Sequence, residues 1–190
     1  PFRGTEKGAV SGCGRTLGMK TSAQQPEDVR YVPIGVIYSE HRRLEETPIQ
    51  PVYARGCRGR IEVRPEFAPG LRDLEGFSHI IVIYHFHRSA GPELTVRPFT
   101  DVKSRGIFST RHPHRPNPIG FSVVRLAGIE GALLHIEDVD ILDGTPLLDI
   151  KPFVPRFDLA AEPRGGWTEN IDEPTARRRG LRNYRKEGGE

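Results

Sequence analysis

Short apolar runs separated by Gly, Pro and Asp follow one another from Tyr31 onward, and this pattern constrains the fold more than any other. Such runs with turn residues between them are typical of an all-β sandwich or barrel. We expect strands at residues 32–39, 59–63, 78–87, 94–97, 106–109, 120–129, 133–138 and 147–151. Asp143-Gly144 predicts a tight turn, and one turn of helix is expected at residues 70–74.

The bulk composition restricts the class of protein. A chain of 190 residues with 36% hydrophobic residues has room for one domain with a core. No apolar run approaches the roughly 20 residues that span a bilayer. Cys13 and Cys57 are the only cysteines, too few for a disulfide framework and without the paired spacing of a zinc site, so we expect a cytoplasmic protein.

Three segments are distinguished by composition. Residues 1–30 have no apolar periodicity and are predicted to be a disordered extension, within which Met19 is a candidate start. Residues 31–155 form the expected β domain. Residues 156–190 are expected to be an irregular basic segment, with Trp167 docking back onto the domain. Its basic residues fit either a solvated tail or a phosphate-binding tail for nucleic acid.

The strand at residues 78–87 carries histidines at alternate positions. A period of two puts His85 and His87 on one face, and His112-x-His114 repeats the spacing further along. Four imidazoles invite a metal interpretation. No acid or cysteine is placed to complete the ligand set, so we expect no metal. The glycine motifs of serine hydrolases, P-loop proteins and Rossmann folds are absent from the predicted domain.

The segment from Thr110 to Gly120 has the composition of a built site. It places three prolines and two arginines between two predicted strands. Each proline fixes φ and removes a backbone N–H, which makes the segment stiff. We interpret it as a loop that holds side chains for a ligand; the alternative is a rigid crossover with solvated arginines.

Several motifs together resemble the TsaA-like family, also known as the YaeB/TrmO family. They span residues 32–155 in the family's order and spacing, and the RPNPIG and DGTP motifs are the most specific. The motifs are Thr47-Pro48-Ile49-Gln50, Gly56-Cys57-Arg58-Gly59-Arg60-Ile61-Glu62-Val63, Leu74-Glu75-Gly76-Phe77-Ser78-His79-Ile80, Phe86-His87-Arg88, residues 111–122, Asp143-Gly144-Thr145-Pro146 and Asp149-Ile150-Lys151-Pro152.

This resemblance implies a small antiparallel β-barrel that binds S-adenosylmethionine without a Rossmann fold, as a homodimer. It also implies methylation of N6 of threonylcarbamoyladenosine next to the anticodon of tRNA, with no metal. The family's cofactor contacts would fall on Pro48, Ile49, Gln50, His87, Arg88, Arg111, Phe121, Asp143, Gly144, Thr145 and Pro146.

Further roles are assigned from side-chain chemistry. Asn117 is our candidate catalytic residue, orienting the base or the loop. Arg115 is expected to pair with tRNA phosphates or with the cofactor carboxylate, because a guanidinium suits either. For the basic segment, the tRNA contacts would be Arg177, Arg178 and Arg179. Two other functions stay open: a non-catalytic S-adenosylmethionine- or RNA-binding regulatory module, and a methyltransferase of another substrate.

Overall fold

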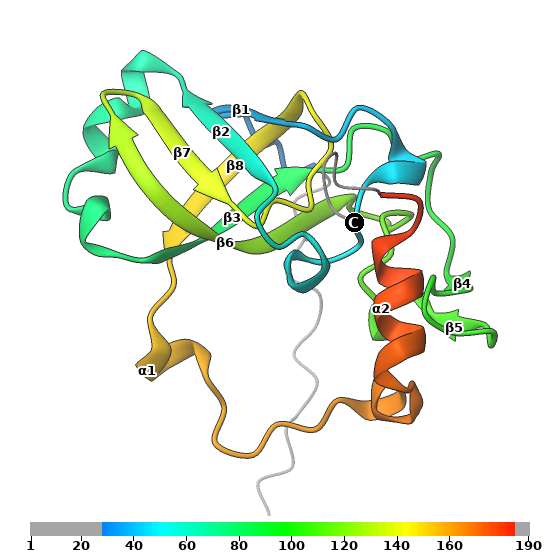
Figure 1. Cartoon of the computed structure of the whole chain (residues 1–190). Helices are drawn as coiled ribbons and strands as arrows, with labels where there is room; N and C mark the ends of the chain where they lie inside the picture. The colour runs from blue at the N-terminus through cyan, green and yellow to red at the C-terminus, as the bar shows by residue number, and fades with distance from the viewer. Residues whose placement is uncertain (1–27, 185–190) are drawn as a thin grey trace, which may run out of the picture. The chain divides into compact units, whose positions relative to one another are not determined.

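Six antiparallel strands close into a barrel in the order β1-β2-β7-β6-β3-β8 (Figure 1). The computed structural model describes residues 28–184. The barrel strands are β1 (Gly35–Ser39), β2 (Arg58–Val63), β3 (His79–His85), β6 (Ile119–Glu130), β7 (Leu133–Glu137) and β8 (Thr145–Pro152). A separate pair consists of β4 (Thr95–Val96) and β5 (Arg105–Gly106). Closure leaves no unpaired barrel edge. Of the two folds that the sequence predicted, the structure is therefore the barrel and not the sandwich.

Alternation along the strands fills the barrel with side chains. In β3, Ile80, Val82 and Tyr84 are buried while the residues between them are partly exposed. Ile37 of β1 and Leu147 of β8 are also fully buried in the same cluster. Each such aliphatic side chain contributes about 1.5–3 kcal/mol of transfer free energy. The interior is therefore a packed core, and a ligand must bind outside it.

Most of the predicted strands are confirmed, and the strand at residues 106–109 is wrong. Only Arg105–Gly106 pairs, and Ile107–Ser109 form a 3-10 turn, η5. The Ser109 hydroxyl donates to the Gly106 carbonyl and the Thr110 hydroxyl donates to the Ile107 carbonyl, both at 2.8 Å. Hydroxyl groups that bond the chain three residues back compete with a strand ladder. The turn follows from this local bonding.

Helical structure is more frequent than the sequence predicted, and most of it is 3-10. The expected turn at residues 70–74 falls on two such helices, which Asp73 separates with a φ of 69°. The 3-10 helices are η1 (Leu44–Glu46), η2 (Pro51–Tyr53), η3 (Pro65–Leu71), η4 (Leu74–Gly76), η5 (Ile107–Ser109) and η6 (Gly166–Asn170). The first five lie between strands, and η6 lies between the two C-terminal helices.

The C-terminal segment contains regular structure that we did not predict. Within the segment after residue 155, which we expected to be less regular than the β domain, the chain forms α1 (Pro155–Asp158) and α2 (Glu173–Leu181). The Asp172 carboxylate caps α2 by accepting from the Thr175 amide at 2.9 Å, a start signal that the sequence carries. The docking of Trp167 is confirmed, since its Nε1 donates to the Ser109 carbonyl at 2.8 Å.

Some expectations lie outside the described residues. They are the disorder predicted for residues 1–27, the role of Met19 and the structure of residues 185–190. Within the described part of the chain, no helix is long and apolar enough to cross a membrane.

Gly120 in β6 supplies the test of this packing. A Cβ at Gly120 would lie 2.7 Å from Cζ of both Tyr84 and Phe86, whereas a Cβ at Gly128 of the same strand meets nothing within 4 Å. Overpacking typically destabilises by about 1–3 kcal/mol. We expect Gly120→Ala to lower the free energy of unfolding in urea by that amount. Gly128→Ala is the matched control, and an equal effect of both substitutions would contradict the packing argument.

Candidate active site

Three residues from the family motifs meet at one end of the barrel. The Arg111 guanidinium donates to the Gln50 side-chain oxygen and lies 4.7 Å from the centroid of the Phe121 ring. Phe121 is on the outer face of β6 and is 44% exposed. A cation over an aromatic face is held by the ring quadrupole. Gln50, Arg111 and Phe121 together are called the rim cluster.

The proline-rich loop is fixed by its own side chains. Nη1 of Arg115 donates to the carbonyls of Thr110 at 2.8 Å and Ile107 at 3.3 Å. The Phe86 amide donates to the Pro118 carbonyl at 2.7 Å, which ties the loop to the end of β3. Arg115 therefore shapes the loop. Asn117 is exposed, and its carbonyl accepts from the Ile119 amide at 2.7 Å.

His112 and His114 contact each other, with 4.6 Å between ring centroids, and differ in their other partners. Nδ1 of His114 lies 2.8 Å from the Glu93 carboxylate, and the His112 ring stacks on Phe99 with 5.8 Å between centroids. Burial lowers the pKa of His112, and burial also lowers the pKa of His87, with help from Arg88. These imidazoles are held neutral near pH 7. Neither His87 nor Arg88 is hydrogen-bonded to the rim cluster among the described residues.

The turn at Asp143-Gly144 directly precedes β8 and is hydrogen-bonded to the end of β1. The Asp143 carboxylate accepts from the Ser39 amide at 3.0 Å and pairs with Arg42 at 2.9 Å. Gly144 takes a φ of 75°, the left-handed conformation that glycine tolerates. The Thr145 hydroxyl donates to the Leu142 carbonyl at 2.6 Å. Asp143 thus stabilises the pairing of β1 with β8, which closes the barrel. Pro146 follows in β8 and pairs with Val36 of β1.

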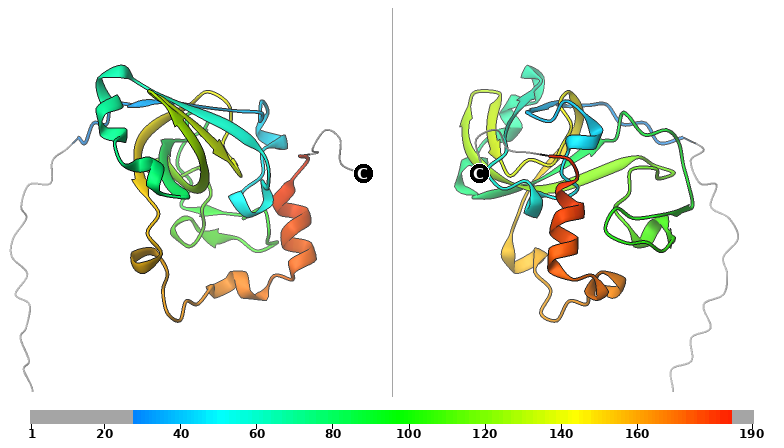
Figure 2. Two further views of the ribbon diagram at one scale, coloured as in Figure 1. Left: turned by 60° about the vertical axis from the view of Figure 1, so that its left-hand side comes forward. Right: turned by 45° about the vertical axis from the view of Figure 1, so that its right-hand side comes forward.

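Helix α2 packs beside the Pro48–Gln50 segment, a contact that the sequence did not predict (Figure 2). The Ile49 amide donates to the Gly180 carbonyl at 2.9 Å, and the Arg182 guanidinium donates to the Leu44 carbonyl. The Tyr53 ring lies against Gly180, which has no side chain to keep it away. The position of Gln50 in the rim cluster therefore depends on α2.

The three arginines of α2 face different surroundings. Nη1 of Arg179 donates to the Thr100 carbonyl at 3.3 Å, while Arg177 and Arg178 are exposed. Beyond the helix, Cys57 Sγ donates to the Tyr184 hydroxyl at 3.1 Å, which in turn donates to Glu40. Among the three predicted tRNA contacts of α2, Arg177 and Arg178 are thus the exposed ones, and Nη2 of Arg178 donates to the Thr175 hydroxyl at 3.3 Å.

Glu40, His41 and Cys57 form a group whose potential ligand atoms lie within 4.8 Å of one another. The Tyr184 hydroxyl already bonds Glu40 and Cys57. Nε2 of His41 bonds the Val139 carbonyl at 2.7 Å. We therefore interpret the group as an anchor for the chain after α2.

The sequence did not predict a buried acidic residue, Asp140, which lies close to the rim cluster. Asp140, in the loop before β8, is buried, and its carboxylate accepts from Ser122 of β6. The Ser122 hydroxyl lies 3.1 Å from the Tyr84 hydroxyl inside the barrel. Burial raises the pKa of Asp140 to about 7, although Ser122 and Arg111 lower it in part. The available signal was an acidic residue within the apolar run Val139 to Leu142.

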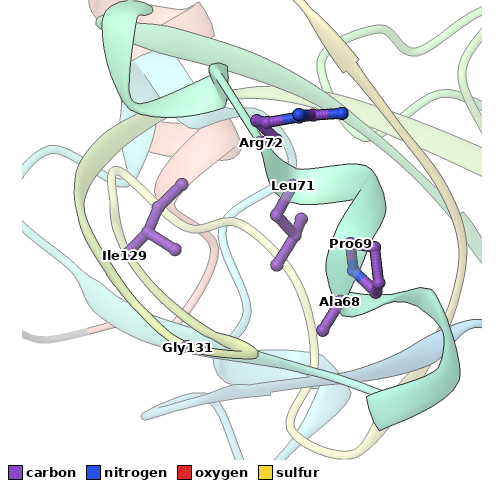
Figure 3. Close-up of a pocket in the computed structure, with 6 residues that line it drawn as sticks. All are labelled: Ala68, Pro69, Leu71, Arg72, Ile129 and Gly131. Atoms are coloured by element: carbon purple, nitrogen blue, oxygen red, sulfur yellow. The ribbon is translucent and has the colours of Figure 1, made fainter.

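Two surface hollows lie apart from the rim cluster. One, of about 440 Å³, lies between η3 and the β6–β7 hairpin (Figure 3), at the opposite end of β6 from Phe121. Arg72 is its only charged lining residue. The second, of about 570 Å³, is lined by Tyr38, Ser39, Glu40, Arg42, Arg58, Gly59, Arg60, His135 and Asp143. Asp143 connects this second hollow to the closing turn.

The fold is a closed six-stranded β-barrel with a motif-bearing loop at its rim. Comparison with known proteins identifies the family. Residues 36–159 match the family model described as the tRNA-methyltransferase O N-terminal domain. The chain belongs to this family.

Relatives and solved structures agree with this assignment. A probable S-adenosyl-L-methionine-binding protein of Pyrococcus abyssi is 54% identical over 76% of this chain and 78% of its own. The tRNA (adenine(37)-N6)-methyltransferase of Homo sapiens is 32% identical over 92% of this chain and 40% of its own. A crystal structure of TrmO from Pseudomonas aeruginosa superposes with a TM-score of 0.65 and 38% identity, covering 77% of this chain and 64% of that one. The chain thus spans less than half of the human relative.

Gly180 tests whether α2 supports the rim cluster. A Cβ there would lie 2.8 Å from Cγ of Tyr53, whereas alanine by itself favours a helix by about 1 kcal/mol over glycine. We expect Gly180→Ala to displace α2 and to speed hydrogen exchange of the Ile49 amide. Gly70→Ala, where a Cβ meets nothing within 4 Å, is the control. Unchanged or slower exchange at Ile49 in Gly180→Ala would show that α2 is not needed there.

Proposed function

We propose that this chain binds S-adenosylmethionine at the rim cluster and methylates N6 of an adenosine in tRNA. The observation that carries the proposal is the convergence of Gln50, Arg111 and Phe121 in a chain of this family. Relatives named as S-adenosyl-L-methionine-binding proteins and as tRNA (adenine(37)-N6)-methyltransferases support it.

The residues present suit the proposed cofactor. The Arg111 guanidinium offers a fork of donors for a carboxylate, and Phe121 offers an exposed aromatic face. Asp140 holds a buried carboxylate oxygen without a hydrogen-bond partner. A zwitterionic ligand with an additional positive charge would find both signs of charge at this end of the barrel.

The protein's task in such a reaction is mainly positioning. S-adenosylmethionine supplies a methyl group on a positively charged sulfur, which needs little covalent help. An exocyclic adenine amine is a poor nucleophile, so its protons need acceptors that hold it in line. The stiff loop offers backbone carbonyls, and we assign Asn117 to orienting the base or the loop. His87, Arg88 and the turn from Asp143 to Pro146 would complete the cofactor contacts.

The proposed substrate is threonylcarbamoyladenosine at position 37, next to the anticodon. We propose that exposed Arg177 and Arg178 of α2 contact tRNA phosphates, while Arg115 and Arg179 serve mainly to hold their own segments. This reaction would take place in the cytoplasm.

We also propose a homodimer. Phe108 is 75% exposed beside the loop, and a second copy would cover it. Sedimentation velocity measures this directly, and a monomer at micromolar concentration would refute it.

Label transfer tests the reaction. Radiolabelled S-adenosylmethionine is incubated with the protein and with tRNA that carries or lacks the threonylcarbamoyl group. We expect label in N6-methylated threonylcarbamoyladenosine for the first tRNA alone. Equal labelling of both would show that the threonylcarbamoyl group is not required. Cofactor binding without any transfer would favour the regulatory-module alternative.

The salt dependence of tRNA binding tests α2. Removing one basic side chain that contacts a phosphate reduces the magnitude of the slope of log K against log salt by about one. We expect the double variant Arg177→Ala, Arg178→Ala to flatten the slope by up to about two while its cofactor affinity is retained. Arg156→Ala, exposed on α1, is the control. A slope equal to that of the unmodified protein would show that Arg177 and Arg178 do not contact tRNA phosphates.

A further inference from the structure

Asp140 occupies a position that the fold alone does not explain. Its side chain is buried, and Oδ1 has no hydrogen-bond partner. Burying a carboxylate is unfavourable unless it is paired. Asparagine has nearly the same shape, would keep a side-chain oxygen for Ser122 and would avoid the cost of burying a charge. The negative charge itself therefore needs a reason.

Hydrogen bonds to the residues directly before and after Asp140 fix the backbone of this position. The carbonyl of Val139 accepts from the His41 ring at 2.7 Å, and the carbonyl of Ile141 accepts from the Ser39 hydroxyl at 2.5 Å. These bonds tie the loop before β8 to the end of β1. The carboxyl group is thus fixed in place without an ion pair.

The charged and titratable groups that face Asp140 come from two elements and the loop. Ser122 of β6 donates to it, and Tyr84 of β3 and Arg111 of the proline-rich loop interact with it electrostatically. Arg111 is the positive charge in this set; its Nη1 donates to Gln50 and its guanidinium lies over the Phe121 ring. Asp140 therefore offsets the charge of Arg111 without being hydrogen-bonded to it.

This arrangement suits a ligand with a positive centre. If Asp140 were uncharged, Arg111 would attract a ligand carboxylate but would repel a cationic group bound nearby. An ionised Asp140 removes that repulsion, and in a partly desolvated site charges interact strongly over several ångströms. The two side chains thus complement a ligand that carries both signs.

We propose that Asp140 is a specificity-determining residue whose buried negative charge makes the site favour the sulfonium of S-adenosylmethionine over the neutral thioether of S-adenosylhomocysteine. The inference rests on the proposed function. It assigns to this residue the discrimination between cofactor and demethylated product, which assists product release after each transfer.

The ionisation of Asp140 gives the proposal a pH signature. Because its pKa is about 7, Asp140 is partly protonated at pH 6.5, and a bound cation would favour the charged form. S-adenosylmethionine binding should then release a fraction of a proton, and S-adenosylhomocysteine binding should release less. Comparing the protein with its variants cancels the titration of the ligands themselves.

Isothermal titration calorimetry with the two ligands is the test. At pH 7.5 we expect Asp140→Asn to weaken S-adenosylmethionine about tenfold, equivalent to about 1.4 kcal/mol, and to change S-adenosylhomocysteine by less than about twofold. At pH 6.5, in two buffers of different ionisation enthalpy, the variant should lose the extra proton release. Asp73→Asn is the matched control, because Asp73 is exposed and asparagine accepts its left-handed φ of 69°.

Stability separates this role from a structural one. The folded-state pKa of Asp140 lies above the unfolded value, so its contribution to stability is present at low pH and is lost as pH rises through about 7. Asp140→Asn avoids this loss. We expect the variant to melt several degrees higher than the unmodified protein at pH 8, with no gain at pH 4.

The outcomes distinguish the two proposals. If the unmodified protein binds neither ligand, the proposed function fails. If it binds both and Asp140→Asn weakens them equally or leaves their ratio unchanged, the role of Asp140 fails while the function stands. Should the variant not fold, proton release by the unmodified protein decides, and equal release with both ligands would overturn the inference.

Discussion

The pairing of β1 with β8 is the interaction on which the rest of the structure depends. It closes the barrel, and it places the Asp143 carboxylate against the Ser39 amide. The same closure brings His41 to Val139 and Ser39 to Ile141. Without it, the loop that carries Asp140 would have no partner across the seam. The pairing of β1 with β8 thus positions both the Asp143-Gly144 turn and the loop that carries Asp140.

The barrel could be predicted from the sequence to a large extent, since period-two alternation and turn residues encode it locally. The β3 alternation and the Asp143-Gly144 turn are examples. Residues 106–109 were assigned to a strand because Ile107 and Phe108 are apolar, yet the hydroxyls of Ser109 and Thr110 favour a 3-10 turn. Helix α2 was missed because its arginine-rich composition suggested a solvated tail, although Asp172 and Pro174 mark its start.

The rim cluster was predictable as a set of residues but not as an arrangement. The motifs singled out Gln50, Arg111 and Phe121, whereas their contact is a product of the tertiary fold. Asp140 was missed for a physical reason. Its environment depends on β3, β6 and the proline-rich loop together, and no local pattern encodes burial of that kind. The support of Pro48–Gln50 by α2 is equally non-local.

Closure of the barrel also sets an order of folding events. Ser39 and Asp143 are 104 positions apart in the chain, and joining such distant segments is entropically slow. The β6–β7 hairpin can form early because its strands are joined by a short turn. The seam between β1 and β8 needs nearly the whole domain to have been synthesised. Partly folded chains would therefore lack the assembled end of the barrel, and a ligand bound there would stabilise only molecules that have completed the seam.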